Sequence, residues 1–408
     1  MKLKPSKRIA IHALLLAGSA AFIFPFVWLV TTSVKPVEQI MKMPPDWLPR
    51  AYYAPVEGQR LKVLKERQVD EPSLIVRYTV AGIVVGTSPS REEKRILLPA
   101  AKYRDGQAEI EVRVADRTEV ARVPATVEKQ VPKGWWLVRE KLDRLPEDPG
   151  PPARWDCAAP EQVEEKVRPA WWNYEGAIRY TGYYEASLFG YSVKIPMFLI
   201  YLRNTLIVAI LGVIGTTLSS ALAAYGFARV SWKGRDAIFL IALSTMMVPF
   251  AVTMVPLYGV FRDLGWIGTL KPLWVPAFFG SAFNIFLLRQ FFRTIPQDIS
   301  EAARIDGCSE FAIFWRIILP LSRPALAVVA LFHFMWAWND FMGPLIFLTK
   351  QDTFTLSLGL QFYQSQHGGS EWHYLMAAST LMILPIVLLF FFTQRTFIQG
   401  ISTTGMKN

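Results

Sequence analysis

The sequence predicts an all-α polytopic membrane protein with six transmembrane helices and a small β-rich insertion between the first and second helices. Of its 408 residues, 52% are apolar, and uncharged stretches of membrane-spanning length recur along it. The formal net charge is +11, yet residues 35–197 are nearly neutral, with 26 basic and 24 acidic side chains. The excess positive charge therefore lies beside the apolar stretches, which is typical of topological lysines and arginines and not of a nucleic-acid-binding patch.

Six apolar stretches are candidates for the spans, since a spanning helix needs about 20 mostly apolar residues. Two of them are short, and we expect flanking residues such as Arg289 to snorkel, or Asp340 to reach the interface. Prolines at positions 25, 249, 256, 276 and 385 remove backbone hydrogen bonds and predict broken or kinked helices. The stretches are 9–34, 204–228, 237–261, 272–288, 324–339 and 372–394.

The distribution of basic residues predicts the orientation of the spans. Lysines and arginines precede the first span, follow the second, and flank the fourth and fifth. By the positive-inside rule these ends are cytoplasmic, so both termini lie inside and residues 35–197 lie outside. Residues 1–34 are expected to be a retained transmembrane helix and not a cleaved signal peptide, because the apolar run continues unbroken to Val34.

Residues 50–170 have the pattern of a small β domain. The stretches "AEIEVRV" and "TEVARV" alternate apolar and polar residues, "LIVRYTVAGIVVG" is rich in β-branched residues, and "RDGQ" supplies a turn. The proline-rich residues 145–154 predict a stiff linker at its end. The domain is either a docking or sensing module or a lineage-specific decoration. Its tryptophans are expected to be core or interfacial anchors: Trp135, Trp136, Trp171 and Trp172.

The chain contains two cysteines, Cys157 and Cys308, which the expected topology places on opposite sides of the membrane. They therefore cannot pair within the chain, and two cysteines exclude a disulfide framework or a zinc cluster. His12 and His373 show no metal-ligand pattern, so we expect no metal site.

Residues 296–320, here called the elbow, lie between the fourth and fifth stretches and carry helix start and stop signals. Pro296 and Asp298 suit a first helical turn, and Gly307 is placed to end the helix in a left-handed conformation. A second helix is expected from Ser309 to Ile318, ended by Pro320.

The side chains of the elbow favour a protein partner over a membrane surface. Burial of a large apolar side chain contributes about 1.5 to 3 kcal/mol, against roughly 0 to 1 kcal/mol for an exposed ion pair. Anionic headgroups would repel the acidic residues, which a membrane-surface helix would replace by lysines. The apolar anchors are Ile299, Ala303, Ile305, Phe311, Phe314 and Trp315, and the acidic residues are Asp298, Glu301, Asp306 and Glu310.

The stretch "FHFMWAWNDFMGP" contains the candidate residues of a translocation pathway. His333, Trp336 and Asp340 share one helix face at spacings of three and four, and Asn339 is adjacent. An aspartate inside a span costs roughly 2.5 to 3.5 kcal/mol, which indicates a cavity. Solvation at a helix end is the alternative explanation, and both remain open.

The elbow carries the order Glu-Ala-Ala, three residues, Gly, and then Ile-x-Leu-Pro. It resembles the EAA loop of permease subunits in binding-protein-dependent ABC importers, and more closely that of the maltose-type second permease of carbohydrate systems. Further supporting stretches are "RNTLIVAILGVIGTTLSSALAAYGFAR", "WAWNDFMGPLIF" and "QRTFIQG". The resemblance implies that the loop couples to a cytoplasmic ATPase, with Glu301, Ala302, Ala303 and Gly307 as the matching core. We expect Asp306, Phe311, Trp315 and Pro320 to take part in this coupling as well.

The resemblance also implies an organisation and a set of partners. Residues 1–34 would be the first helix, 35–197 the extracytoplasmic segment, and 198–408 a five-helix core with a coupling loop at 293–322. The chain would act in the bacterial inner membrane on a sugar or oligosaccharide, as a non-enzyme without a bound cofactor or nucleic acid. Its partners would be a second permease in a heterodimer, two ATPase subunits that use ATP and magnesium, a solute-binding protein and membrane lipid.

Three features qualify or complement this resemblance. Trp47-Leu48-Pro49 and Asn173-Tyr174, which follow each other closely in the family, are separated here by the β insertion, and the tail "QGISTTGMKN" lacks the usual ending. The sequence contains no Gly-x-x-x-x-Gly-Lys-[Ser/Thr], so ATP hydrolysis of that type needs a partner.

Two other functions are alternatives to an ABC permease. They are an ion-coupled secondary carrier that uses Asp340 and His333, and a membrane-anchored assembly or sensor protein.

Overall fold

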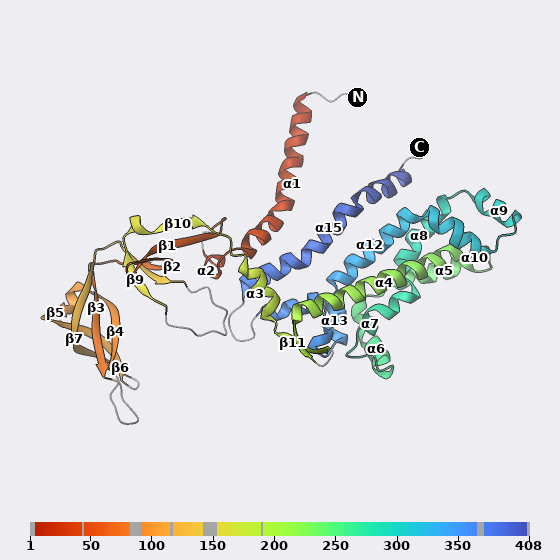
Figure 1. Ribbon diagram of the computed structural model, residues 1–408. Coiled ribbons are helices and arrows are strands. Elements are labelled where there is room, and N and C mark those ends of the chain that lie inside the picture. The colour runs from red at the N-terminus through yellow and green to blue at the C-terminus, as the bar shows by residue number, and fades with distance from the viewer. Residues whose placement is uncertain are drawn as a thin grey trace. The chain divides into compact units, whose positions relative to one another are not determined.

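The computed structural model describes residues 5–42, 45–81, 91–114, 117–141, 153–188, 191–364 and 371–405 (Figure 1). The chain forms two compact units, of which the first comprises Met1–Pro45 with Ala170–Asn408 and the second Asp46–Pro169. The first unit is mainly helical and the second is built of strands. Most of the proline-rich residues 145–154 lie outside the described residues.

The long helices of the first unit coincide with the apolar stretches of the sequence. Among the described residues, four helical segments are long and apolar enough to cross a membrane: Ile11–Ser33, Met197–Ala228, Lys271–Thr294 and Trp372–Gln394. Two bent helix pairs raise the number to six if each pair forms one span. The chain is thus a polytopic membrane protein. The helices concerned are α1 (Pro5–Ser33), α4 (Met197–Ala228), α7 (Lys271–Trp274), η4 (Val275–Phe279), α8 (Ala282–Thr294), α12 (Arg323–Asn339) and α15 (Trp372–Gly405).

Proline breaks some of these helices and leaves others continuous. Pro249 has an extended backbone (φ −69°, ψ 143°) and separates α5 (Arg235–Ser244) and η3 (Thr245–Met247) from α6 (Phe250–Asp263), with a bend of 99°. Pro276 lies at the start of η4, the 3-10 segment that separates α7 from α8. At Pro25, Pro256 and Pro385 the helix is not broken, since these prolines lie inside helices that continue past them. A neighbouring helix or a local adjustment can satisfy the single carbonyl that each of these prolines frees.

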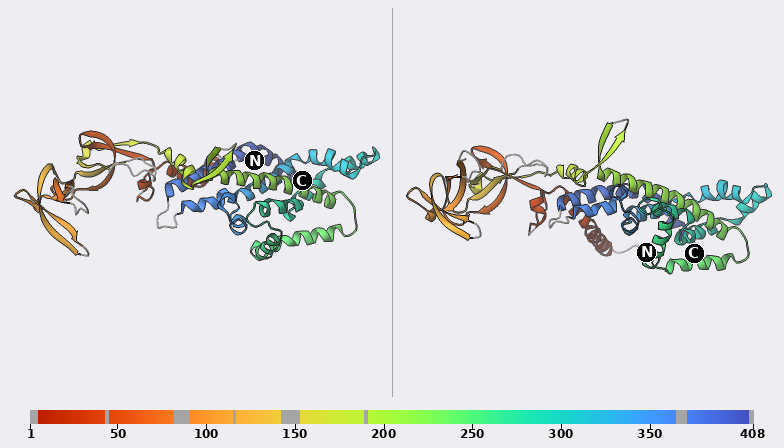
Figure 2. Two further views of the ribbon diagram at one scale, coloured as in Figure 1. Left: turned by 60° about the horizontal axis from the view of Figure 1, so that its bottom comes forward. Right: turned by 90° about the horizontal axis from the view of Figure 1, so that it is seen from below.

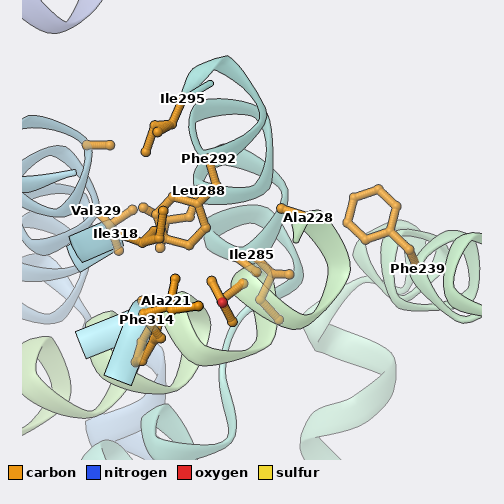
Figure 3. Close-up of a cluster of buried hydrophobic side chains, with 14 of the residues drawn as sticks. Ala221, Ala228, Phe239, Ile285, Leu288, Phe292, Ile295, Phe314, Ile318 and Val329 are labelled. Carbon is orange, nitrogen blue, oxygen red and sulfur yellow. The ribbon is translucent and has the colours of Figure 1, made fainter. Parts of the chain in front are cut away.

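Helix α4 lies at the centre of the first unit and packs against α8 and α12. Three of the four α4 residues in the buried cluster at this contact are alanines, including Ala221, whereas side chains from α8 are larger, such as Leu288 and Phe292 (Figure 3). Lipid is as apolar as these side chains, so close packing holds such helices together more than hydrophobic transfer does. At Gly215 a Cβ atom would overlap the ring of Phe278. The small residues therefore set how closely the helices approach.

The chain leaves α1 and returns from the second unit at one buried junction. Asn173, 1% exposed, donates two hydrogen bonds from Nδ2, to the carbonyls of Ser33 and Lys35, each 2.9 Å long. The hydroxyls of Tyr174 and Ser33 lie 2.8 Å apart, and the Ala170 amide donates to the Val34 carbonyl. Asn173 and Tyr174 thus close the end of α1 although the insertion separates them from it in sequence.

Short elements complete the first unit. After α1 comes α2 (Val37–Ile40), and the returning chain forms α3 (Trp172–Tyr180) and a hairpin of β11 (Tyr183–Leu188) and β12 (Tyr191–Pro196). The sequence had not predicted this hairpin, which directly precedes α4. Between α12 and α15 lie α13 (Met342–Phe347), η6 (Gln351–Thr353), α14 (Leu356–Gly359) and η7 (Leu360–Tyr363).

The second unit contains two five-stranded antiparallel sheets, in the orders β10-β1-β2-β8-β9 and β4-β3-β7-β6-β5. Strands form where the sequence alternates: "AEIEVRV" lies in β6 and "TEVARV" in β7. The predicted turn at "RDGQ" is present, since Asp105 and Gly106 have φ values of 52° and 78° between paired Arg104 and Gln107. Positive φ at both central residues is the signature of a tight hairpin turn.

The strands of the second unit have buried apolar faces and charged outer faces. Trp135 and Trp136 pack against its buried clusters, as expected of core anchors. Cys157 is fully buried and unpaired, and burial raises the pKa of its thiol to about 11. The remaining elements are β1 (Arg50–Val56), β2 (Gln59–Gln68), β3 (Ser73–Ala81), β4 (Arg91–Pro99), η1 (Ala100–Lys102), β5 (Tyr103–Arg104), β6 (Gln107–Val114), β7 (Arg117–Val131), β8 (Trp136–Glu140), β9 (Trp155–Ala158), η2 (Pro160–Gln162) and β10 (Glu164–Val167).

Replacement of Asn173 tests the junction. Asn173→Ala leaves two buried carbonyls without their donor and should lower the free energy of unfolding by about 1 to 3 kcal/mol. Tyr174→Phe is the matched control: it removes one hydroxyl contact and should cost about 0.5 to 1.5 kcal/mol. Thermal unfolding of the detergent-purified chain measures both, and equal transition temperatures for Asn173→Ala and wild type would contradict the assignment.

Candidate functional site

The elbow begins with helix α9 (Gln297–Ile305), which ends as the sequence predicts. Gly307 has φ 81°. The amide of Cys308 donates to the Ala303 carbonyl (2.9 Å) and that of Gly307 to the Arg304 carbonyl (3.0 Å). These two bonds form a Schellman motif, which needs a left-handed residue at the position of the glycine. The turn at Gly307 joins the two arms of the elbow.

The second arm starts as expected and ends close to the expected residue. Ser309 caps α10 (Glu310–Ile313) by accepting a hydrogen bond at Oγ from the Ala312 amide. The arm continues as a π-helical segment, η5 (Phe314–Ile318), into α11 (Leu319–Leu321), and ends one residue after the predicted Pro320, at a bend of 80° before α12. The Leu319 amide donates to the Phe314 carbonyl, five residues earlier. Such a widened turn accommodates a proline, which lacks an amide hydrogen and crowds the preceding turn.

The apolar side chains of the elbow divide into a buried and an exposed set. Ala303 and Phe314 are 6% and 3% exposed and belong to the core cluster around α4. Ile305, Phe311 and Trp315 are 87%, 66% and 53% exposed. The rings of Phe311 and Trp315 are nearly parallel, with centroids 6.3 Å apart. We call Ile305, Phe311 and Trp315 the elbow surface.

The remaining predicted coupling residues also divide by exposure. Glu301, Ala302, Asp306, Gly307 and Pro320 are all exposed. Ala303 differs because its side chain faces the core of this chain, so only its neighbours remain accessible to another molecule. The predicted set therefore lies on the surface with the single exception of Ala303.

A charged network, which the sequence did not reveal, joins the elbow to α4. The carboxylate of Glu310 accepts a bond from Arg304 Nε at one oxygen (2.7 Å) and from the Tyr225 hydroxyl at the other (2.6 Å). Arg304 and Glu310 lie on opposite sides of the Gly307 turn, whereas Tyr225 is on α4. In the views of Figures 1 and 2 the elbow lies at the C-terminal end of α4. Glu310 is thus engaged within the chain.

A second candidate site is a cavity of about 750 Å³ in the first unit. His333, Trp336 and Asp340 line it, as their shared helix face predicts, and the first two rings have centroids 5.5 Å apart. Asn339 does not line it, because its side chain donates to the Met335 carbonyl. Asn284 and Thr216, which the sequence did not single out, add polar groups to the wall and are bonded to each other.

The two expectations about charged groups at the ends of the short spans have different outcomes. Arg289 does not snorkel: it is 6% exposed and donates to Asp236 (2.8 Å) and to the Phe227 carbonyl, with its guanidinium over the Phe239 ring. Its partner Asp236 is 70% exposed, so the ion pair lies at the edge of the packed helices. Asp340 lines the cavity and also accepts a bond from the Gly343 amide at the helix end, so both interpretations of this residue apply.

No group of three or more histidine, cysteine or acidic residues is placed to hold a metal ion within the described ranges. Cys157 is buried and Cys308 is exposed, and both are unpaired.

Comparison with known proteins identifies the family. Residues 215–403 match the model of the binding-protein-dependent transport system inner membrane component. An arabinooligosaccharides transport system permease protein of Halalkalibacterium halodurans is 37% identical over 204 residues, covering 50% of this chain and 72% of that protein. A trehalose/maltose transport system permease protein of Thermococcus litoralis is 35% identical, covering 51% and 75%. A lactose transport system permease protein of Rhizobium radiobacter is 36% identical, covering 48% and 71%.

The chain belongs to the family of inner membrane components of binding-protein-dependent transport systems. The resemblance inferred from the sequence is confirmed, and with it the conclusion that the chain is a transporter permease component and not an enzyme. Among solved structures, a bacterial ABC transporter involved in the import of the acidic polysaccharide alginate is similar, with 22% identity, a TM-score of 0.48, and coverage of 58% of this chain and 81% of that chain.

Replacement of Tyr225 tests the network between α4 and the elbow. Tyr225→Phe removes the bond to the Glu310 carboxylate, and hydrogen bonds to charged groups contribute about 1.5 to 3 kcal/mol. Amide hydrogen exchange of residues 297–321 should therefore become at least several-fold faster in the purified chain. Tyr258→Phe, on α6, is the control and should leave exchange in the elbow unchanged. Identical exchange in both variants would show that Tyr225 does not hold the elbow.

Proposed function

We propose that the chain is the membrane-spanning subunit of an ATP-driven importer of a sugar or oligosaccharide, and that it couples ATP hydrolysis by a partner to translocation through the elbow. Membership of the family and relatives named for arabinooligosaccharides, trehalose/maltose and lactose support the substrate class. The observation that carries the coupling role is the exposed elbow surface, beside a turn fixed by Gly307.

In this proposal the bent pair of α5 and α6 forms one span and α12 forms another, which together with the four long helical segments gives six spans. Both termini and the elbow are then cytoplasmic, and residues 35–197 lie outside the bacterial inner membrane. Four spans, from α1 to α8, then precede the elbow, so the basic clusters before α1, after α4 and around the elbow all lie on one side, as the positive-inside rule requires. The β-rich unit, inserted between the first two spans, is extracytoplasmic.

The partners follow from what this chain leaves exposed. Two ATPase subunits, which bind ATP and magnesium, would bind the elbow of this chain and the elbow of a second permease. A solute-binding protein would deliver the substrate from outside. Burial of three large side chains such as Ile305, Phe311 and Trp315 contributes about 1.5 to 3 kcal/mol each. Movement of the ATPases would then reach α4 through Glu310 and Tyr225. Neither an ion-coupled carrier nor a sensor is proposed, because the family supports transport with partners.

Substitution of Gly307 tests the coupling role. Gly307→Val places a β-branched residue at φ 81°, which costs about 1 to 2 kcal/mol and should distort the turn. ATP hydrolysis by the reconstituted complex should then lose its dependence on substrate, and less ATPase should copurify. Gly307→Asn is the matched variant, since asparagine tolerates this conformation, and it should keep most of the coupling. If both variants transport as well as wild type, the elbow is not the coupling element.

Labelling of Cys308 tests orientation and docking together. This exposed thiol lies in the turn of the elbow, so a membrane-impermeant maleimide should reach it in inside-out vesicles and not in intact cells. Assembly with the ATPase should reduce the labelling. Cys157 is an internal control: its pKa of about 11 and its burial should keep it unlabelled until the chain is denatured. Labelling of Cys308 in intact cells would reverse the proposed topology.

We further propose that the cavity lined by His333, Trp336 and Asp340 forms part of the translocation pathway. Its volume of about 750 Å³ is within the range of small-molecule sites. An aromatic ring beside polar groups suits a sugar, whose apolar faces stack on rings while its hydroxyls form hydrogen bonds. Asn284 and Thr216 add such groups to the wall.

The pathway assignment predicts a contrast between residues on one helix. Trp336→Ala removes a ring from the cavity and should lower the rate of sugar uptake by proteoliposomes about tenfold, without loss of ATPase binding. Asn339→Ala is the control, because its side chain bonds to the Met335 carbonyl away from the cavity, and uptake should change less than twofold. Equal uptake by the two variants would show that the cavity is not part of the translocation pathway.

A further inference from the structure

A second, smaller pocket of about 340 Å³ lies between the C-terminal end of α4, the loop that follows it and helix α9. It is distinct from the 750 Å³ cavity and from the elbow surface, since it shares no residue with either. Its wall is strongly polar and carries one more positive than negative charge. The charged and polar side chains that line it are Arg229, Ser231, Arg235, Gln297, Ser300, Glu301, Arg304 and Glu310.

Most charges in this wall already have partners. Arg304 and Glu310 form an ion pair, so they cancel. Arg229 donates its two terminal nitrogens to the carbonyls of Ile295 and Pro296, and these bonds hold α4 to the start of α9. Arg235 donates to the Val230 carbonyl.

Three buried hydrogen-bond donors on residues of the wall form no hydrogen bond within the described part of the chain. Ser300 is 1% exposed, and its Oγ has no hydrogen-bond partner among the described residues. The same holds for the buried Nε of Arg229. Arg235 Nε is buried too and forms no hydrogen bond, although it lies 3.5 Å from Asp236 Oδ1. Buried polar groups are almost always hydrogen-bonded, and an unsatisfied one costs about 1 to 3 kcal/mol.

Guanidinium and hydroxyl groups on residues that line one polar pocket match a ligand with several acceptor oxygens. Burial without a counter-charge also lowers the pKa of Arg229, which an anion would reverse. The one carboxylate of the wall outside the ion pair, Glu301, is exposed to solvent and so weakly opposes a bound anion. Arginine is the residue that most often recognises phosphate, through its fixed array of donors.

We propose that this pocket binds a phosphate group, held by Arg229, Arg235 and Ser300. The group would bridge the end of α4 and helix α9, in addition to the Tyr225–Glu310 bond. Its source is either a lipid headgroup or free phosphate. The pocket begins where the apolar part of α4 ends, at Ala228, and the nearby Trp232 is partly exposed as interfacial anchors are.

The experiment compares lipid and inorganic phosphate on the full-length chain. After removal of lipid in detergent, the chain is titrated with phosphatidylglycerol, with diacylglycerol as the phosphate-free equivalent, and bound molecules are measured by native mass spectrometry. In parallel, unfolding temperatures are measured with sodium phosphate and with sodium chloride at equal ionic strength. The variants are Arg229→Gln and Ser300→Asp, and Arg293→Gln is the control, since this exposed arginine of α8 does not line the pocket.

Ser300→Asp is informative even if Arg229→Gln fails to fold, because its carboxylate would itself satisfy the arginines and exclude phosphate. Phosphatidylglycerol should bind wild type and Arg293→Gln with equal affinity. It should bind Ser300→Asp at least about tenfold more weakly, in line with loss of a charged hydrogen bond. Diacylglycerol should not bind in this manner. Stabilisation of wild type, but not of Ser300→Asp, by inorganic phosphate alone would assign the site to free phosphate. If neither probe distinguishes Ser300→Asp from wild type, the proposal is wrong.

Discussion

Close packing around helix α4 is the constraint on which the rest of the helical unit depends. Small residues along this helix let α8, α12 and the second arm of the elbow approach it, and Ala221 and Ala224 are fully buried. Between apolar helices in lipid, the gain comes from contact and not from removal of water. A larger residue would separate the helices, since even a Cβ atom at Gly215 would overlap the ring of Phe278. The cavity and the elbow are both built on this contact.

The elbow combines two opposite tasks in a short segment. Phe314 and Ala303 belong to the core, so they fix the elbow to the helices, while Phe311 and Trp315, close by in sequence, are left to solvent. The π-helical segment Phe314–Ile318 has more residues per turn than a regular helix, and it contains both the buried Phe314 and the exposed Trp315. Because Glu310 is hydrogen-bonded to Tyr225, a force on the exposed side chains of the elbow would reach α4 through a single hydrogen bond.

The β-rich insertion is tolerated because the helical unit closes behind it. Asn173 bonds to Ser33 and Lys35, so the chain returns to the point where it left α1, and the insertion adds no break to the helical packing. The adjacent Asn and Tyr residues are therefore structural here. A junction with a buried amide and two carbonyl acceptors is strongly specified, because each unmade bond carries a desolvation cost.

The sequence by itself determined the apolar stretches, the strands of the insertion and the turn at Gly307, because composition, alternation and glycine conformation are local properties. It also indicated the face shared by His333, Trp336 and Asp340. Only the tertiary structure decided that Arg289 is buried against Asp236, that Glu310 binds Tyr225, and which apolar residues of the elbow remain exposed. These depend on contacts between segments far apart in the chain, which no local pattern encodes. The helical conformation at Pro320 also depends on tertiary contacts, because the π turn that accommodates this proline lies within a segment packed against α4.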